Sequence, residues 1–259
     1  MPSLSSPAIL LRRIDHGDYD LIITFFTLYH GKMSSMAKAA KKSMKRFSGI
    51  LELFSVLDIV CNSGRGRGLA ILQEASLKEP FSGIRADLRK TAYASYWVEL
   101  VNEWMEDSVK DAQVYNLLLH VLGNLNSNLF SEEFLSIVFQ MKFIKIVGIS
   151  PNLRQCNTCG TDLEKIANEK VCLDPARGGL LCEKCSTGTS KRCRLSKGTV
   201  KQLLWIENGN LDLVGRIRFS PRAAREALGF LETFVPYHMG KKLRSLKVLR
   251  QLKTDGGFC

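Results

Sequence analysis

Short apolar runs, rich in β-branched and aromatic residues, alternate with polar turn segments over the first eighty residues. The runs occupy residues 8–14, 21–31, 49–61 and 69–77, and a further strand is expected within 32–47. Between them, DHGDYD and the glycine-rich NSGRGRG have the composition of turns. Five short strands of this kind predict a Greek-key barrel of the OB type, while an SH3-like barrel or a small sandwich would give a similar pattern.

The apolar spacing becomes that of α-helices from about residue 84 onward. Asp111, Ser131 and Ser220 are suitable N-caps, and Pro151 ends the third helical segment. The predicted helical segments are 84–107, 111–126, 131–150, 196–209, 220–240 and 241–252. Because helices precede and follow a cysteine-rich segment, we expect that segment to be an insertion into one helical domain.

Four of the eight cysteines form two CxxC pairs, Cys156 with Cys159 and Cys182 with Cys185. A CxxC turn places two thiolates on one side of a tetrahedral ion, and a second pair completes the shell. The 22 residues between the pairs contain a predicted hairpin that turns at 174–179. Four thiolates leave no open coordination position, so the spacing predicts structural zinc and not catalytic zinc.

The other cysteines have no matching partner spacing. Cys172 is expected to pack in the hairpin, although it and Cys193 are alternatives as ligands. Cys61 and Cys259 stand alone. The predicted fold class is therefore α+β and multidomain: an OB-fold β-barrel, then an α-helical domain with an inserted four-cysteine zinc-finger module. The expected segments are the barrel at 1–80, the first helical part at 81–150, the zinc module at 151–190, and the second helical part with a basic C-terminus at 191–259.

The net charge is +12 and the isoelectric point is about 9.4. Basic residues exceed acidic ones in 1–80 and most strongly in 186–259, whereas 81–185 is slightly acidic. This distribution favours one cationic surface made from both ends, or simply a soluble basic protein. No apolar run is long enough to span a membrane, and no secretory signal is recognisable at the start, so a cytosolic location is expected.

Residues 32–47 carry six lysines or arginines, and no acid occurs between Asp20 and Glu52. Taken alone, the segment has the pattern of a basic amphipathic helix, as in a membrane-surface or calmodulin-binding helix. Its position between two strand-like runs instead favours an outer strand, with Lys32 and Lys38 exposed, that leads into a basic loop ending at Phe47.

Patterns for catalysis are missing from the sequence. The four histidines lie in unrelated contexts, GRGRG lacks the Gly-Lys-Ser/Thr ending of a P-loop, and the acids of 15–20 do not complete a calcium loop. A zinc-dependent nuclease or deaminase would need an open metal position and a general base, which four cysteines do not supply. A binding protein without enzymatic activity is the better interpretation.

The N-terminal order resembles that of the bacterial recombination mediator RecO family. An apolar strand ends in arginine, an Asp-x-Ile-x-Thr-like strand follows, and a His-Gly-Lys turn leads to a basic segment that closes on Arg-Phe. The matching positions are Arg12, Asp20, Thr24, Phe26, Thr27, His30, Gly31, Lys32, Lys38, Lys41, Arg46 and Phe47. The zinc pairs and YHMGKKLRSLKVL at 237–249 are similar to the same family. Ala39 stands where the family usually has Gly, and Lys41 where it commonly has Arg.

The resemblance implies a cytoplasmic bacterial protein of recombinational DNA repair, associated with the nucleoid during repair. It implies binding to single- and double-stranded DNA, annealing of complementary strands, contacts with RecR and the single-strand-binding protein, and an indirect role in loading RecA. Not every member keeps four cysteines, so the zinc prediction depends on the spacing in this chain. An RNA-binding or ribosome-associated OB-fold zinc protein is the alternative.

Two groups of basic residues are the candidate binding surfaces. Sequence-independent strand binding needs a cationic track more than base-reading side chains. The expected DNA-binding residues are Arg12, Arg13, Lys32, Lys38, Lys41, Lys42, Lys45 and Arg46. A second group extends the DNA track or meets an acidic partner tail; it comprises Arg216, Arg218, Arg222, Arg225, Lys241, Lys242, Arg244 and Lys247. Stacking aromatic residues are available at Phe25, Phe26, Tyr29 and Phe54, although alternation places some of these in the core.

Overall fold

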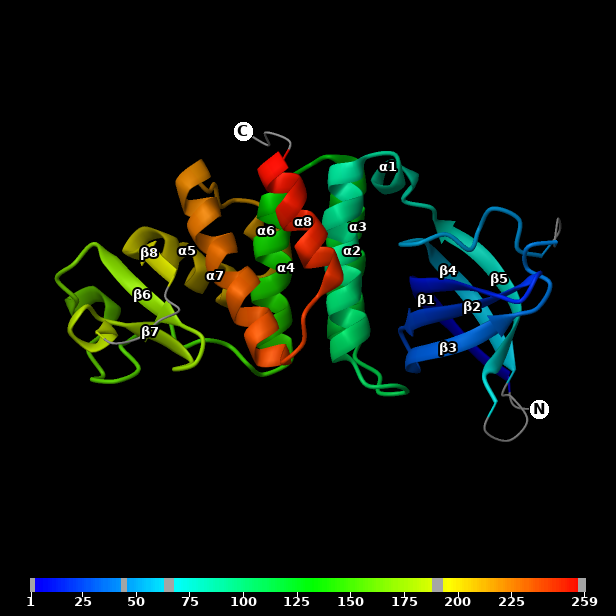
Figure 1. Cartoon of the computed structure of the whole chain (residues 1–259), viewed down its shortest axis with the longest axis horizontal. Helices are drawn as coiled ribbons and strands as arrows, with labels where there is room; N and C mark the ends of the chain where they lie inside the picture. Colours follow the sequence, from blue (N-terminus) through cyan, green and yellow to red (C-terminus); the bar gives the residue numbers. More distant parts are fainter. Residues whose placement is uncertain (1–2, 43–45, 63–67, 188–192, 256–259) are drawn as a thin grey trace. The chain divides into compact units, whose positions relative to one another are not determined.

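Five N-terminal strands close into a barrel in the computed structural model (Figure 1). The structure describes residues 3–42, 46–62, 68–187 and 193–255. The chain divides into two compact units, one of residues 1–127 with 248–259 and one of residues 128–247. The finer division expected from the sequence remains a prediction.

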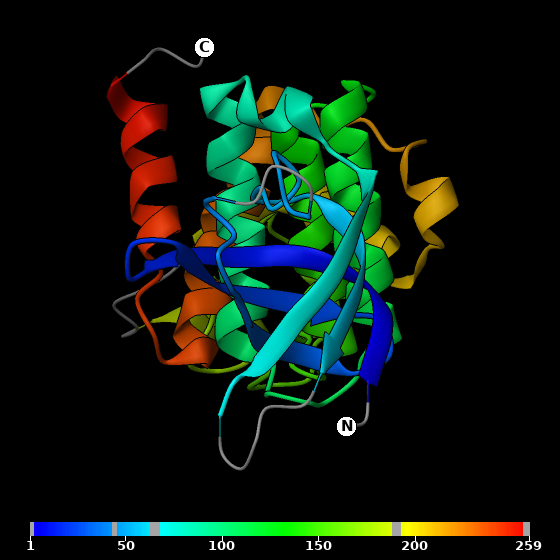
Figure 2. The same cartoon turned by 90° about the vertical axis from the view of Figure 1, so that its right-hand side faces the viewer.

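The barrel has the strand order β1-β2-β3-β5-β4. All neighbouring strands are antiparallel except β3 and β5, which pair in parallel at Ser35–Ala70 and Met36–Ile71. Figure 2 shows the strands crossing one another around the closed sheet. This arrangement confirms the OB-like barrel. The strands are β1 (Ser3–His16), β2 (Asp20–Thr27), β3 (Gly31–Ala37), β4 (Val56–Asn62) and β5 (Ala70–Glu79).

Inward-facing apolar residues from all five strands fill the barrel. Leu10, Ile23 and Phe25 are fully buried, as alternation along each strand requires. The loop of residues 38–55, here called the β3–β4 loop, contributes Phe47 and Leu51 to the same core. Beyond the irregularity in pairing between Leu10 and Arg12, β1 and β2 continue as a hairpin in which residues 12–16 of β1 are exposed, whereas Leu21 and Ile23 of β2 stay buried.

The basic segment 32–47 is a strand followed by turns in its described part, so the interpretation as an amphipathic helix is wrong. β3 pairs with β2 along its whole length and ends at Ala37. The β3–β4 loop then bends back against the tip of the β1–β2 hairpin, where the backbone N–H of Lys41 donates to the carbonyl of Tyr19 at 3.0 Å.

The first unit also contains α1 (Ser82–Arg85), α2 (Leu88–Trp104) and α3 (Ala112–Ser127). Helix α2 begins four residues later than the predicted start at 84. The reason is Asp87, whose extended backbone stops the preceding turn and whose carboxylate accepts from the N–H groups of Arg89 (2.8 Å) and Lys90 (3.1 Å). Asp111 caps α3 in the same way, as predicted.

The second unit contains helices and a small sheet in the order β7-β6-β8. Ser131 and Ser220 cap α4 and α7 as predicted, and Gly240 ends α7. Helix α8 continues from this unit into the first. The elements are α4 (Glu132–Ile146), β6 (Lys170–Asp174), β7 (Gly179–Leu181), β8 (Cys193–Ser196), α5 (Lys197–Asn208), α6 (Leu211–Val214), α7 (Pro221–Met239), α8 (Arg244–Asp255) and the 3-10 helices Leu163–Lys165 and Lys184–Ser186.

Ala39 generates a stability prediction because its φ of 53° lies in the left-handed region, where a β-carbon is unfavourable. Its N–H donates to the Asp20 carboxylate at 2.7 Å, which holds the turn. We expect Ala39→Gly to raise the free energy of unfolding by about 1 kcal/mol, measured by denaturant unfolding of the whole chain. The matched control is Ala40→Gly, which removes a buried methyl group from the barrel core and is expected to lower stability. Equal losses from both substitutions would contradict the strain argument.

Candidate nucleic-acid surface and metal centre

The β3–β4 loop carries basic side chains on the outside of the barrel while its apolar residues hold it from within. Phe47 and Leu51 are buried, whereas Lys38, Lys41 and Lys42 are exposed. The loop is fixed further at Ala39 and Lys41 by hydrogen bonds to the β1–β2 turn. A run of positive charge in the sequence therefore becomes a positioned cationic surface.

Two carboxylates from outside the acid-free segment form ion pairs with basic residues of this surface. The local sequence did not predict these pairs. Arg13 Nη1 lies 2.8 Å from Glu52 Oε1, and Lys41 Nζ lies 2.9 Å from Asp15 Oδ2. These carboxylates come from the two flanks of the acid-free stretch, and only the folding of the hairpin against the loop brings them to the lysine and arginine.

Two further cations of this surface lie over aromatic rings. The Lys42 ammonium is 3.4 Å from the centroid of the Tyr19 ring, a cation–π arrangement that orients the side chain. Arg46 lies 4.6 Å from the centroid of Phe47 and donates through Nη2 to the Leu72 carbonyl at 3.3 Å. Arg12 is exposed on the hairpin. Lys45 lies outside the described residues.

Lys32 does not have the exposed position expected for it. Its side chain is only 16% exposed, and Nζ contacts the Asn102 carbonyl at 2.8 Å and Asp107 Oδ1 at 3.3 Å. A β-carbon on the neighbouring Gly31 would lie 2.2 Å from the Val109 carbonyl oxygen, so only glycine permits this approach. Lys32 therefore attaches β3 to the α2–α3 connection, and the expectation of exposure is wrong.

The stacking candidates are mostly core residues. Phe25, Phe26 and Phe54 are buried, and Phe26 packs against the ring of Tyr115. Tyr29 at the β2–β3 turn is 57% exposed. Of the four candidates, only Tyr29 presents its ring to solvent.

The second basic group lies in the C-terminal part of the chain. Arg216, Arg218 and Arg225 are exposed just before and within the start of α7, and Arg222 pairs with Glu226 at 3.0 Å. The remaining members flank the start of α8 and are exposed as well; they are Lys241, Lys242, Arg244 and Lys247.

The second unit also contains a row of half-buried aromatic rings that the sequence argument missed. Phe130 and Phe134 are 5.3 Å apart, and Phe134 is 6.4 Å from Phe219. Phe219 directly follows Arg218, and the 130/134 spacing of one helical turn is the sequence signal that was available. Basic and aromatic side chains are thus combined around the start of α7.

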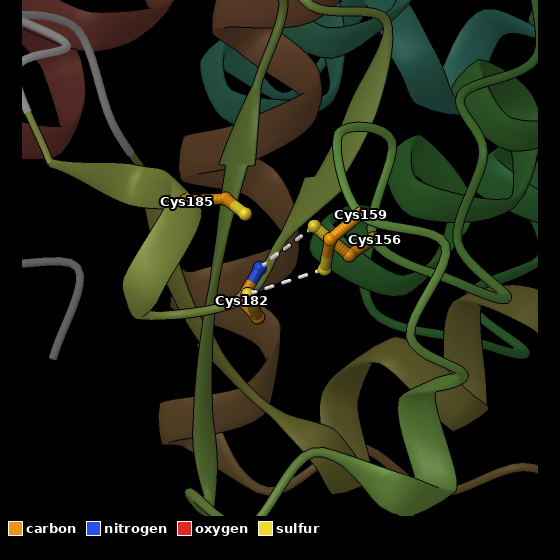
Figure 3. Close-up of side chains that lie close together, drawn as sticks. All are labelled: Cys156, Cys159, Cys182 and Cys185. Atoms are coloured by element: carbon orange, nitrogen blue, oxygen red, sulfur yellow. Dashed lines mark hydrogen bonds between the residues drawn. The ribbon is translucent and has the colours of Figure 1, made fainter.

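The two CxxC pairs meet at one point in the second unit (Figure 3). All four sulfur atoms lie within 4.8 Å of one another, and Cys159 Sγ is 3.7 Å from Cys182 Sγ. Four sulfurs at about 2.3 Å from a tetrahedral zinc ion are about 3.8 Å apart, so the donor set and its spacing fit zinc. Among the described residues, no other group of three or more His, Cys, Asp or Glu comes close enough to hold a metal ion.

Tight turns present the sulfurs of each pair. In the first, the Cys156 N–H donates to the Thr161 carbonyl at 2.8 Å and the Gly160 N–H donates back to the Cys156 carbonyl at 2.9 Å. In the second, the Cys185 N–H donates to the Cys182 carbonyl at 3.1 Å. The Cys182 N–H also points to Cys156 Sγ at 3.4 Å, which joins the two turns.

Their surroundings shift the pKa values of Cys159 and Cys185 in opposite directions. Hydrogen bonding to the Thr161 side chain and backbone lowers the pKa of Cys159 to about 6. Hydrogen bonding to Cys182 and desolvation raise the pKa of Cys185 to about 12, because a further thiolate would form beside other sulfurs. A divalent cation would favour the thiolate form of all four.

The predicted hairpin is β6 and β7, and it connects the two metal-binding turns. Asn152 pairs with the strand through Asn152 N–H to the Gly178 carbonyl (2.9 Å) and Leu180 N–H to the Asn152 carbonyl (2.8 Å). A β-carbon on Gly179 would lie 2.4 Å from the Asn152 carbonyl oxygen, so this approach also requires glycine. Backbone hydrogen bonds at Asn152 therefore join the segment before Cys156 to β7, the strand before Cys182.

The remaining cysteines are away from the cluster wherever the structure describes them. Cys172 is buried in β6, as expected, and Cys61 is buried in the barrel, where burial raises its pKa to about 11. Cys193 begins β8, and Cys259 lies outside the described residues. No described helix combines the length and the hydrophobicity that crossing a membrane requires.

Comparison with known proteins gives a consistent result over nearly the whole chain. Residues 1–81 match the family model "Recombination protein O N terminal", and residues 85–247 match "Recombination protein O C terminal". The chain is 42% identical over 258 residues to the DNA repair protein RecO of Desulfosudis oleivorans, covering 98% of this chain and 99% of the relative. The protein of that name from Desulfatibacillum aliphaticivorans is 41% identical over 254 residues, with 98% of both chains covered. A more distant relative, from Bacillus pumilus, is 29% identical over 251 residues, 97% of this chain and 95% of the relative.

The metal site generates a direct prediction. We expect the protein to bind one zinc ion per chain, and Cys159→Ser to abolish stoichiometric binding because it removes one of four ligands. Zinc content after gel filtration, measured by elemental analysis, checks this. The matched control is Cys172→Ala, which changes a buried cysteine of β6 that is not part of the cluster and is expected to keep the zinc. Full zinc content in Cys159→Ser would show that the four cysteines are not the ligands.

Proposed function

The chain belongs to the RecO family of DNA repair proteins, and on this premise we propose that it is a non-enzymatic recombination mediator that binds and anneals DNA strands. The observation that supports this most is the β3–β4 loop, whose exposed lysines lie on an OB-like barrel and are held there by buried Phe47. Such a surface meets the phosphate backbone, which is the same in every sequence.

Annealing follows from charge neutralisation. Two complementary strands repel through their phosphates, and a protein that neutralises them lowers the cost of bringing them together. Because the described stacking candidates are largely buried, we propose that the bases of the bound strands are left free to pair. The binding energy comes from released counterions, so binding weakens steeply as salt rises.

The proposed partners are single- and double-stranded DNA, RecR, the single-strand-binding protein and, indirectly, RecA in the bacterial cytoplasm. The zinc ion would have a structural role, because its four thiolate ligands leave no position for a substrate or water. The binding of RNA instead of DNA remains the alternative to be excluded by experiment.

DNA binding is expected to depend on the exposed lysines of the β3–β4 loop. In Lys38→Glu/Lys41→Glu, the slope of log K against log salt for single-stranded DNA should fall by about 1.4, because two phosphate contacts are lost. The strand-annealing rate should fall with it. The control Lys78→Glu/Lys110→Glu makes the same change of charge elsewhere in the first unit and should leave the slope unchanged. Binding to RNA alone, or annealing untouched by the loop substitutions, would overturn the proposal.

The second basic group is proposed to bind the acidic tail of the single-strand-binding protein. Phe130, Phe134 and Phe219 favour this over a pure DNA track, because an acidic peptide with apolar residues needs both basic and aromatic contacts. We expect Arg216→Glu/Arg225→Glu to weaken binding of a synthetic tail peptide roughly tenfold, measured by fluorescence anisotropy. Lys170→Glu/Lys184→Glu, on the zinc module, is the control. Unchanged affinity in the arginine variant would leave DNA as the ligand of this surface.

A further inference from the structure

A surface hollow of about 200 Å³ lies where the β3–β4 loop meets the β1–β2 hairpin. Its lining includes apolar groups from Leu21 and Phe47 and polar groups from Ser48. Arg13, Lys41 and Glu52 also line it. We call it the hairpin hollow. Arg13 and Lys41, two of the basic residues assigned to DNA binding, thus line one concave surface.

Both cations of the hairpin hollow are paired with a carboxylate of the same chain. Arg13 pairs with Glu52 at 2.8 Å, and Lys41 pairs with Asp15 at 2.9 Å. All four side chains remain partly exposed, with Glu52 at 40% and Asp15 at 70%. Ion pairs in contact with water contribute little to stability, so an external anion can replace these carboxylates at low cost.

The Arg13 guanidinium keeps one contact when its carboxylate leaves, and the Lys41 backbone stays attached to the hairpin. Arg13 Nη1 also donates to the Leu51 carbonyl at 3.2 Å, a bond that does not involve Glu52. Within the described part of the chain, the other guanidinium N–H groups of Arg13 donate to no protein acceptor. The backbone of Lys41 is held by Tyr19. A phosphate offers the same acceptor oxygens as a carboxylate and suits a guanidinium held in this way.

We propose that Glu52 and Asp15 occupy the positions of two DNA phosphates in the free protein, and that a bound strand displaces them from Arg13 and Lys41. This inference rests on the proposed function and identifies the hairpin hollow as its phosphate subsite. The two acids then limit affinity: each DNA contact made here replaces an existing ion pair and is weaker than a contact with an unpaired cation.

The test is to remove the carboxylates without changing side-chain size. Glu52→Gln and Asp15→Asn should each raise affinity for single-stranded DNA about two- to fivefold at fixed salt, the range equivalent to one exposed ion pair. The control Asp58→Asn makes the same change of charge and breaks the pair with Lys78 at 2.8 Å. Asp58 is opposite Pro7 in the barrel, near the other end of β1 from Asp15. An equal gain from Asp58→Asn would show a general charge effect and overturn the inference.

A double-mutant cycle gives the second criterion. In an Arg13→Gln background, Glu52→Gln should no longer raise affinity, because its partner is already gone. A gain that persists in this background overturns the inference. Failure of the wild-type protein to bind DNA would refute the proposed function itself, whereas normal wild-type binding with a neutral Glu52→Gln refutes only the role of the carboxylates. Thermal unfolding of each variant confirms that it is folded.

Discussion

The burial of Phe47 and Leu51 in the barrel is the contact on which the basic surface depends. Both residues belong to the β3–β4 loop, and each fully buried apolar side chain of this size contributes about 1.5–3 kcal/mol. Without these anchors, the first part of the loop, whose residues 38–46 carry five basic side chains and no acid, would extend, because its charges repel and its backbone entropy favours disorder. The anchors convert a charge run into a surface with a fixed position, and they also form one wall of the hairpin hollow.

The sequence was sufficient to predict features that depend on residues close together along the chain. The N-caps at Ser131 and Ser220 depend on residues within one helical turn, and the CxxC pairs depend on a spacing of three. The barrel class followed from recognising short strands in a basic N-terminal segment together with the family resemblance. The unusual backbone at Ala39 was also signalled, since the family usually has Gly there and the structure has φ of 53°.

The sequence was insufficient where partners are distant along the chain. Lys32 contacts Asn102, 70 positions away, and Arg13 contacts Glu52, 39 positions away. A lysine in a basic segment looks the same in the sequence whether its side chain faces solvent or donates to a carbonyl of another element. Local sequence patterns therefore cannot distinguish an exposed lysine from a buried one. The late start of α2 has a different cause. The apolar periodicity extends back to residue 84, but Asp87 has an extended backbone and caps the helix, so α2 begins at Leu88.

The two units use different interactions to fix short irregular segments. In the first, apolar anchors suffice because the barrel supplies a core for Phe47 and Leu51 to enter. In the second, the turns around Cys156 and Cys182 join through hydrogen bonds to a small hairpin, and their sulfurs crowd within 4.8 Å. The neighbouring Cys182 thiol and desolvation raise the pKa of Cys185, so crowding opposes the thiolate form of that cysteine. A bound divalent cation would favour the thiolate form of all four cysteines. It would also cross-link two chain segments that are too short to build a hydrophobic core of their own.

Under the proposed function, the protein binds and anneals DNA strands and must then release the product, so the highest possible affinity for DNA is a disadvantage. Unpaired lysines and arginines would bind phosphate more tightly and would also repel one another in the free protein. The carboxylates beside Arg13 and Lys41 relieve that repulsion in the free protein, and in the proposed exchange they compete with phosphate for the two cations. Because Arg13 is also held by the Leu51 carbonyl, its guanidinium keeps one contact during the proposed exchange of the Glu52 carboxylate for phosphate. The backbone of the surface can then stay fixed through the cycle of binding and release, and the barrel core that holds it is not disturbed.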